Sequence, residues 1–381
     1  MPEVYIHDAV RTPVGKLGGS LAALRPDDLA ATVVKALAER NPGATPDEVY
    51  FGDANQAGED NRNVARMAVL LAGLPTSVPG ATVNRLCGSG MEAAFSASRA
   101  IAVGDETCCI AGGVESMSRA PWVVLKPEKP FPRTSETMYS TTLGWRMVNP
   151  EMPDEWTVSL GEGAEILADR YGIAREVQDE FALDSHKKAA AAWDRGAFAD
   201  EIVEMEPLAR DENIRADTTL EKLGQLKPVF RKDGTVTAGN SSPMNDAASA
   251  VLLSASADGA IARVVSRASS AVEPQLYGIG PVEAANKALE RAGIGWGDLA
   301  AVELNEAFAA QSLACLAEWK ELDPAILNVN GGAIALGHAL GNSGTRLLTT
   351  LAHELKRRGG GWGLATMCIG VGQGVAMVIE A

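Results

Sequence analysis

The stretch that decides the fold is VNRLCGSGMEAAFSASRAIA, residues 83–102. A short apolar run ends at Cys87, three small residues follow (Gly88, Ser89 and Gly90), and a helical pattern then begins. A buried thiol at a turn is one interpretation. The other is a nucleophile at the tip of a helix, where the positive end of the helix dipole favours the thiolate.

The same order of elements occurs twice in the chain. KALAERNPGATPDEVYFGDANQAG, residues 35–58, predicts a helix, a turn and an apolar strand, and KALERAGIGWGDLAAVELNEAFA, residues 287–309, repeats that order. Each is followed by a Val-Asn strand end, a glycine-rich elbow with Ser-Gly, a helix and a buried strand that ends in glycines. Alternating strands and helices predict parallel βαβ units, so the chain is expected to hold two similar α/β halves.

The helix predicted after residue 340 has a clear apolar side. Leu347, Leu348, Leu351, Ala352 and Leu355 recur at i, i+3 and i+4, and Arg346, Glu354 and Arg357 lie opposite them. His353 falls on that polar side and is expected to face solvent.

The segment between the two halves differs from them in composition. Residues 118–245 are rich in Pro, Trp and charge, and they contain one helical hairpin at residues 161–196. We expect an inserted loop domain there, an N-terminal half formed by residues 1–117 and 246–262, and a C-terminal half formed by residues 263–381.

Composition restricts the class of protein. The formal net charge of −15 argues against nucleic acid as a partner, because phosphate binding depends on clustered Lys and Arg. No apolar run is long enough to predict a membrane span, and the first residues lack a signal-peptide core, which predicts a cytoplasmic protein. Five cysteines without a CxxC pair predict reduced thiols and no zinc site, and Cys108, Cys109 and Cys315 are expected in the core.

Four segments place a reactive side chain among small residues. They are NRLCGSG with Cys87, LNEAFAA with Asn305, GGAIALGHALGNSG with His338 and CIGVGQG with Cys368. A thiol with an imidazole partner supports nucleophilic acyl transfer, and glycine lets substrate and backbone N–H groups come close. Taken singly, His338 could be a packed loop residue, Cys368 a core residue and Asn305 a helix cap. The residues alone therefore leave acyl transfer and hydrolysis both open.

Together these segments resemble the thiolase family along nearly the whole chain. AGGVESMS, residues 111–118, and TAGNSSPMNDAASA, residues 237–250, also resemble family segments, and all six occur in the family's order. The resemblance implies a thiolase fold of two βαβαβαββ halves in five αβαβα layers with an inserted loop domain. It also implies a homodimer or a homotetramer built as a dimer of dimers. Coenzyme A is then a substrate, with no bound cofactor or metal.

Roles for the site residues follow from the same resemblance. Cys87 attacks a 3-oxoacyl-CoA, His338 activates it, and Cys368 moves the proton at the acetyl-CoA methyl carbon. Asn305 holds a water that forms an oxyanion site with His338, and backbone N–H groups of Cys87 and Gly370 form a second one. The expected contacts with CoA are Ser242 at the pantetheine arm and Arg215 near the adenine and phosphate end, and Leu160 stands where related enzymes line a short acyl pocket.

Three positions depart from the family pattern. Ala339 follows the histidine where proline is common, Ser159-Leu160 replaces a His-Met pair of acetoacetyl-specific members, and Ala247 replaces a glycine. The first and the last are expected to leave catalysis intact, whereas the second bears on the acyl chain.

Two further segments resemble one branch of the family, the 3-oxoadipyl-CoA thiolases of aromatic-compound degradation. They are GEDNRNVARMAVLLAGLPTSVPG, residues 58–80, and TTLGWRMVNP, residues 141–150. A dicarboxylate substrate calls for a cation near the nucleophile, and the candidates are Arg85, Arg119, Arg133 and Arg146. The alternatives are an acetoacetyl-CoA or fatty 3-oxoacyl-CoA thiolase, a ketoacyl synthase, a cysteine hydrolase and a non-catalytic acyl-CoA binder.

Overall fold

Two series of strands and helices follow the same order along the chain in this computed structural model, which describes residues 2–381. The first series is β1 Val4–Arg11, α1 Pro26–Arg40, β3 Glu48–Gly52, α2 Val64–Leu71, β4 Gly80–Val83, α3 Ser89–Val103, β5 Cys108–Ser116 and β8 Asn245–Ser254. The second is β9 Ala262–Ala271, α7 Gly280–Ala292, β10 Leu299–Leu304, α8 Ala309–Glu318, α10 Leu340–Arg358, β11 Trp362–Ile369 and β12 Gln373–Glu380. These series confirm the predicted internal repeat. The place of β4 in the second half is taken by a single bridge between Val302 and Leu327.

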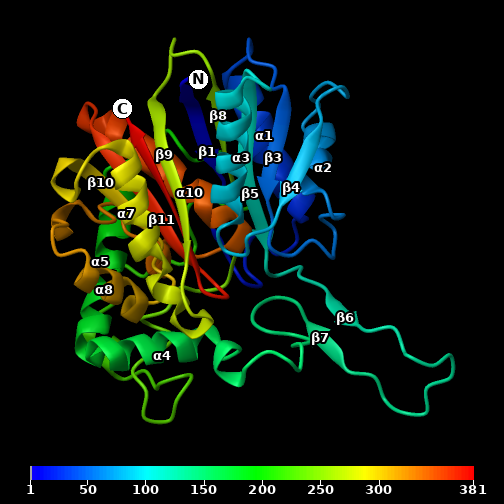
Figure 1. Ribbon diagram of the computed structural model, residues 1–381, viewed down its shortest axis with the longest axis vertical. Coiled ribbons are helices and arrows are strands. Elements are labelled where there is room, and N and C mark those ends of the chain that lie inside the picture. The colour runs from blue at the N-terminus through cyan, green and yellow to red at the C-terminus, as the bar shows by residue number, and fades with distance from the viewer. Residues whose placement is uncertain (1) are drawn as a thin grey trace.

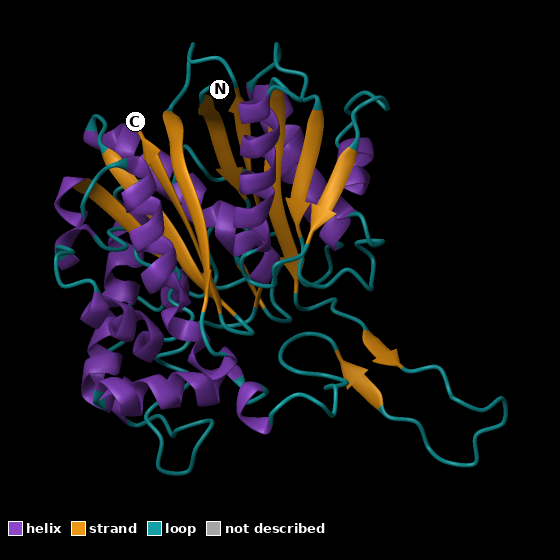
Figure 2. Ribbon diagram, in the orientation of Figure 1, coloured by secondary structure: helices purple, strands orange, loops and turns teal. Residues whose placement is uncertain are grey.

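The strands of both halves join in one ten-stranded sheet with the order β10-β11-β12-β9-β1-β8-β5-β3-β4, and β2 Gly15–Lys16 pairs with β8. Figure 2 shows these strands side by side, with helices packed on both sides. β3 runs parallel to β4 and β5, and β10 runs parallel to β11, as the alternating pattern predicts. The sheet as a whole is mixed, because β8 and β12 each run antiparallel to both of their neighbours.

Helices α3 and α10 pack against each other and against strands of both halves. The two helices therefore lie between the strands of the first half and those of the second, and they form the middle of the five αβαβα layers. Their apolar side chains share one core with residues of β1, β5, β8, β9, β11 and β12. Glycines allow this close approach, since a Cβ on Gly90 would lie 2.6 Å from the Gly341 carbonyl oxygen. α1 and α2 cover the outer side of the first half, and α7 covers that of the second.

This central position overturns one expectation for α10, the exposure of His353. The predicted apolar side is buried, but so is the opposite side as far as Leu355. Arg346 is buried and its Nη1 donates to Glu303 Oε2 at 2.9 Å. His353 is 4% exposed and its Nε2 bonds the Ala9 carbonyl at 2.8 Å, so the expectation that His353 faces solvent is wrong. The polar side chains of α10 bond to partners inside the protein, because strands of the sheet cover both sides of this helix.

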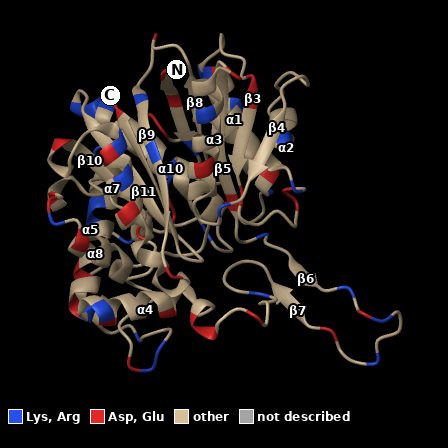
Figure 3. Cartoon of the chain, viewed as in Figure 1, with Lys and Arg blue, Asp and Glu red and all other residues tan. Residues whose placement is uncertain are grey.

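The remaining elements lie between β5 and β8 or beside the strand ends. They are β6 Trp122–Val124, β7 Met138–Ser140, η1 Asp154–Trp156, α4 Leu160–Tyr171, α5 Arg175–Asp194, α6 Leu220–Gly224, η2 Pro274–Ile279, η3 Trp296–Asp298, η4 Pro324–Ile326 and α9 Ala333–Leu336. α4 and α5 are the predicted helical hairpin. Figure 1 shows the chain between β6 and β7 extending away from the body as an arm, and Figure 3 shows basic and acidic residues mixed along it.

Two of the three cysteines that were expected in the core lie there. Cys109 and Cys315 are fully buried as predicted, whereas Cys108 is half-buried at the start of β5. Within residues 2–381 no helix combines the length and the apolar composition needed to cross a bilayer.

Candidate active site

Cys87 lies on a tight elbow between β4 and α3. Leu86, the residue before it, has φ 49°, a left-handed conformation that costs free energy in a residue other than glycine. Ser89 holds this conformation, because its Oγ accepts from the Arg85 N–H at 2.9 Å and donates to the Leu86 carbonyl at 2.6 Å. A Cβ on Gly88 would overlap Ile369, so the small residue allows β11 to approach the nucleophile.

The Cys87 thiol is more deeply placed than expected. Only 8% of the residue is exposed, so it lines an internal cavity instead of standing open at the helix tip. Burial raises the pKa of the Cys87 thiol to about 11, although a hydrogen bond from the Gly370 backbone N–H favours the thiolate. Burial thus opposes the stabilisation of the thiolate that the helix terminus is expected to provide. The thiol needs a base.

His338 supplies a neutral base. It follows the short helix α9, and its backbone N–H donates to Asn245 Oδ1 at 2.9 Å. Its Nδ1 lies 2.6 Å from Ser343 Oγ, in the first turn of α10. Burial lowers the pKa of His338 to about 4, so the imidazole is uncharged at neutral pH and can accept a proton.

Asn305 lies directly after β10, beside the histidine. Its backbone N–H donates to the Thr366 carbonyl at 3.0 Å, and its Nδ2 lies 3.5 Å from His338 Nδ1. The following helix begins at Ala309, with Phe308 at its N-cap, so Asn305 does not cap it. Its Oδ1 is buried and accepts no hydrogen bond from the described residues, as expected of a carbonyl that receives a water or substrate.

Cys368 lies near the end of β11, beside Tyr277 and Ala307 in a small cluster. Burial raises the pKa of the Cys368 thiol well above its usual range, and the proximity of Cys87 raises it further. The resting form is thus a thiol that can donate a proton. The Tyr277 hydroxyl donates to the Leu160 carbonyl at 2.8 Å, which fixes the first turn of α4 beside this thiol.

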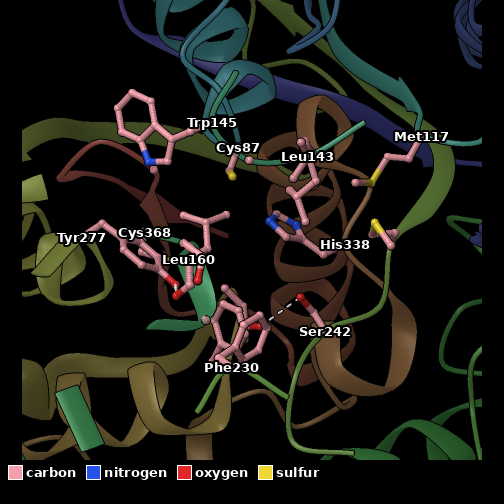
Figure 4. Close-up of a pocket in the computed structure, with 18 of the residues that line it drawn as sticks. Cys87, Met117, Leu143, Trp145, Leu160, Phe230, Ser242, Tyr277, His338 and Cys368 are labelled. Carbon is pink, nitrogen blue, oxygen red and sulfur yellow. Dashed lines mark hydrogen bonds between the residues drawn. The ribbon is translucent and has the colours of Figure 1, made fainter. Parts of the chain in front are cut away.

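Three of these side chains converge on one cavity of about 370 Å³, whereas Asn305 is not among the residues that line it. Cys87, His338, Cys368 and Gly370 line it, and Figure 4 shows Cys87, His338, Leu160, Tyr277 and Ser242 around the same space. The other lining residues are mostly apolar and include Met117, Leu143, Trp145, Phe230, Met244, Phe308 and Leu340. A mostly apolar cavity with two thiols, a neutral imidazole and backbone donors is suited to covalent acyl transfer.

The residues expected to contact CoA are separated. Ser242 and Leu160 line the cavity of Cys87, and Ser242 Oγ donates to the Ala307 carbonyl at 3.0 Å. Arg215 instead lines a neighbouring hollow with His186 and Asn213, on the other side of Pro243. Because Pro243 borders both spaces, one elongated molecule could contact Ser242 and Arg215 together.

The four arginine candidates differ in their surroundings. Arg85 donates to Glu92 and to Gln373, both at 3.0 Å, and Arg119 pairs with Glu59 at 2.7 Å. Arg133 is exposed on the arm between β6 and β7. Arg146 alone among the four lines a cavity that also contains Cys87.

Sequence reasoning missed several residues of the site. Ser343, Asn245 and Met244 hold or contact the histidine, and Tyr277 and Glu115 lie near the thiols. Ser343 stands in GGAIALGHALGNSG and could have been found as a polar residue one helical turn beyond His338. Tyr277 had no such signal, because it reaches the site through the folding of η2 against α4.

The fold and the site define a cysteine-dependent acyltransferase, and comparison with known proteins gives its family. Residues 4–257 match the thiolase N-terminal domain and residues 259–381 match the thiolase C-terminal domain. The chain therefore belongs to the thiolase family.

Similar proteins cover the whole chain. It is 54% identical to the beta-ketoadipyl-CoA thiolase of Pseudomonas putida, with 100% of each chain covered. It is 51% identical to the 3-oxoadipyl-CoA/3-oxo-5,6-dehydrosuberyl-CoA thiolase of Escherichia coli, with the same coverage. The structure of human mitochondrial 3-ketoacyl-CoA thiolase in complex with CoA superimposes with a TM-score of 0.93 at 39% identity, covering 100% of this chain and 98% of that one.

Proposed function

We propose that this enzyme cleaves 3-oxoadipyl-CoA with free CoA and forms succinyl-CoA and acetyl-CoA. The convergence of Cys87, His338 and Cys368 on one cavity is the observation that supports the reaction type. The substrate is supported by the full-length similarity to enzymes named for it. CoA is a substrate here, and no bound cofactor enters the steps.

The first half-reaction acylates Cys87. His338 Nε2 takes the thiol proton, and the sulfur attacks the 3-oxo carbon, whose oxygen is stabilised by the N–H groups of Cys87 and Gly370. One such donor contributes about 3 kcal/mol to lowering a barrier. The bond between C2 and C3 then breaks, His338 and a water on Asn305 stabilise the enolate of acetyl-CoA, and Cys368 donates a proton to its methyl carbon.

The second half-reaction reverses the proton movements. The Cys368 thiolate takes the proton of the incoming CoA thiol, whose sulfur attacks the acyl group on Cys87. The Cys87 thiolate leaves and recovers its proton from His338, so each residue returns to its starting state. Ser242 would contact the pantetheine arm and Arg215 the adenine and phosphate end.

We also propose that the chain divides as its sequence suggests, with residues 118–245 as a CoA-binding insertion between two catalytic halves. A homodimer or a dimer of dimers is supported by β4, an edge strand with one unpaired side, and by the arm, on which Phe131 is 90% exposed. Five free cysteines support a reducing compartment such as the cytoplasm.

The test is CoA-dependent thiolysis of 3-oxoadipyl-CoA beside acetoacetyl-CoA, followed by the loss of enolate absorbance. The expected result is a clear preference in kcat/KM for 3-oxoadipyl-CoA and no activity in Cys87→Ser. Good activity on acetoacetyl-CoA alone would be consistent with the proposed mechanism but would refute 3-oxoadipyl-CoA as the substrate. Release of free acid without CoA would show hydrolysis.

A further inference from the structure

Cys87 opens onto two cavities. The first, of about 370 Å³, holds His338, Cys368 and Ser242. The second, of about 400 Å³, is lined by Asn55, Glu115, Thr141, Thr142, Arg146, Met147 and Val371. Cys87, Leu143, Leu160, Leu340 and Gly370 border both. The nucleophilic sulfur therefore stands at a junction between two spaces.

Two parts of a linear 3-oxoacyl-CoA extend in different directions from the 3-oxo carbon that Cys87 attacks, namely the thioester arm and the acyl tail. The thioester arm belongs with Ser242 and with the groups that stabilise the enolate, so it occupies the first cavity. The acyl tail beyond the 3-oxo carbon then enters the second cavity. This assignment rests on the proposed thiolase reaction, and it makes the lining of the second cavity responsible for the choice of acyl chain.

The second cavity carries one cation, Arg146. Its side chain is exposed, and it makes no ion pair or hydrogen bond with another residue in the described part of the chain. Its neighbour Trp145 is anchored, because the indole N–H donates to the Val158 carbonyl at 3.2 Å. The guanidinium is thus free to bind an anion while the backbone beside it is held.

The length of the acyl chain limits where a cation that binds the terminal carboxylate can lie. The terminal carboxylate of a 3-oxoadipyl chain is three carbon–carbon bonds from the attacked carbon, which limits their separation to about 4 Å. A cation that binds it must therefore lie close to Cys87, and Arg146 is the one cation that lines a cavity with Cys87 among the described residues. Arg85 and Arg119 are paired with carboxylates, and Arg133 lies on the arm, so these three do not meet the requirement.

One acidic residue, Glu115, also borders the second cavity. Its Oε2 accepts from the Ala54 N–H at 3.1 Å and from the Gly341 N–H at 2.9 Å. Burial raises the pKa of Glu115 to about 7, so its charge is partly removed at neutral pH. A carboxylate in this cavity is therefore favoured near Arg146 and disfavoured near Glu115.

We propose that Arg146 is a specificity-determining residue that binds the terminal carboxylate of a dicarboxylic acyl chain. A guanidinium can bind a carboxylate through two parallel hydrogen bonds, which gives both attraction and orientation. The same contact would hold the succinyl group on Cys87 while CoA enters. An uncharged acyl chain would gain nothing from it.

The experiment compares Arg146→Gln with wild type on 3-oxoadipyl-CoA and acetoacetyl-CoA, with Arg133→Gln as the matched control. Arg146→Gln is expected to lower kcat/KM for 3-oxoadipyl-CoA at least tenfold, mainly through KM, and to change that for acetoacetyl-CoA less than twofold. Arg146→Lys should recover part of the loss. Added salt should reduce the preference for 3-oxoadipyl-CoA in wild type but not in Arg146→Gln.

The outcomes separate this proposal from the one on which it rests. If wild type prefers 3-oxoadipyl-CoA and Arg146→Gln keeps that preference, the role of Arg146 is refuted and the function stands. Equal losses on both substrates would show a structural role and would also refute it. If wild type does not cleave 3-oxoadipyl-CoA, the proposed function fails first.

Discussion

The Nδ1 atom of His338 lies 2.6 Å from Ser343 Oγ, and the Ser343 hydroxyl donates to the Ala339 carbonyl at 2.8 Å. With its one proton directed at the Ala339 carbonyl, the serine oxygen is left to accept from the imidazole, and we assign the ring proton on that basis. The proton of the neutral ring is thereby placed on Nδ1, and Nε2 is left free as the base for Cys87. One residue of α10 fixes the tautomer of the catalytic histidine.

Ser343→Ala is expected to lower kcat about five- to tenfold, the effect of one net hydrogen bond of about 1 kcal/mol on the orientation of His338. KM should change little, because Ser343 is not among the residues that line the cavity. Steady-state kinetics on the preferred substrate checks this. Ser98→Ala is the control, since the Ser98 hydroxyl bonds only the Phe95 carbonyl at 3.0 Å in its own helix. A loss of the same size in both variants would contradict the assignment.

Alkylation of Cys87 by iodoacetamide should accelerate steadily with pH. Burial raises the pKa of this thiol to about 11, so the reactive thiolate increases across the whole range from pH 7 to 9.5. The measurement is the rate of modification of the peptide that contains Cys87, followed by mass spectrometry. A plateau near pH 8 would show instead that the helix terminus and His338 stabilise the thiolate in the free enzyme.

The loss of kcat/KM at acidic pH should begin well below pH 6.5, where an unperturbed histidine titrates. Burial lowers the pKa of His338 to about 4, so activity should stay level as the pH falls from 8 to 5. The pKa of His186 is also lowered to about 4, mainly by burial. Unfolded histidines titrate near 6.5, so these two residues contribute stability that is complete above pH 6.5 and is lost as the pH falls towards 4.

The pH profile therefore has to be measured with a parallel record of folding, such as circular dichroism at each pH. A loss of activity centred near pH 6.5 in protein that is still folded would contradict the neutral, buried state of His338.

The sequence allowed the repeat and the reactive residues to be predicted, because both depend on local patterns. Glycines next to Cys87, His338 and Cys368 mark places where the backbone must turn or approach another segment. The order of helix, turn and strand in residues 35–58 and 287–309 likewise needs no knowledge of distant contacts. Both halves have this order of elements in the structure.

What could not be predicted depends on contacts between distant segments. A helical period shows which side of α10 is apolar, but it cannot show that sheet strands cover both sides, so His353 was assigned wrongly. The pKa of Cys87 is set mainly by burial, and Leu143, Leu160 and Leu340, which line the same cavity, come from separate parts of the chain. The second cavity also combines residues 54–55, 141–147 and 371, and only Arg146 had been singled out among them.

Gly90→Ala should destabilise the middle layer by about 1–3 kcal/mol, because the added Cβ would lie 2.6 Å from the Gly341 carbonyl oxygen and 2.9 Å from Thr345 Oγ1. Gly43→Ala is the control, since a Cβ there would meet no atom within 4 Å. Urea unfolding of both variants gives the comparison. Equal stability of the two would mean that α3 and α10 separate at little cost.

Arg11 connects β1 to the inserted segment, and its loss should cost much more stability than the loss of an exposed ion pair. Its guanidinium donates to Asp211 Oδ1 at 2.7 Å and Oδ2 at 3.0 Å and to Glu201 Oε1 at 2.5 Å, and the Arg11 side chain is 1% exposed. Arg11→Met leaves two buried carboxylates without their cation, which costs about 3–5 kcal/mol in the free energy of unfolding. The matched variant is Lys35→Met, which breaks a pair with Glu39 at 3.8 Å between side chains that are 60% and 68% exposed. Such an exposed pair contributes less than about 1 kcal/mol. If urea unfolding gave similar losses for both variants, the buried network would not be what holds the insertion to the first half.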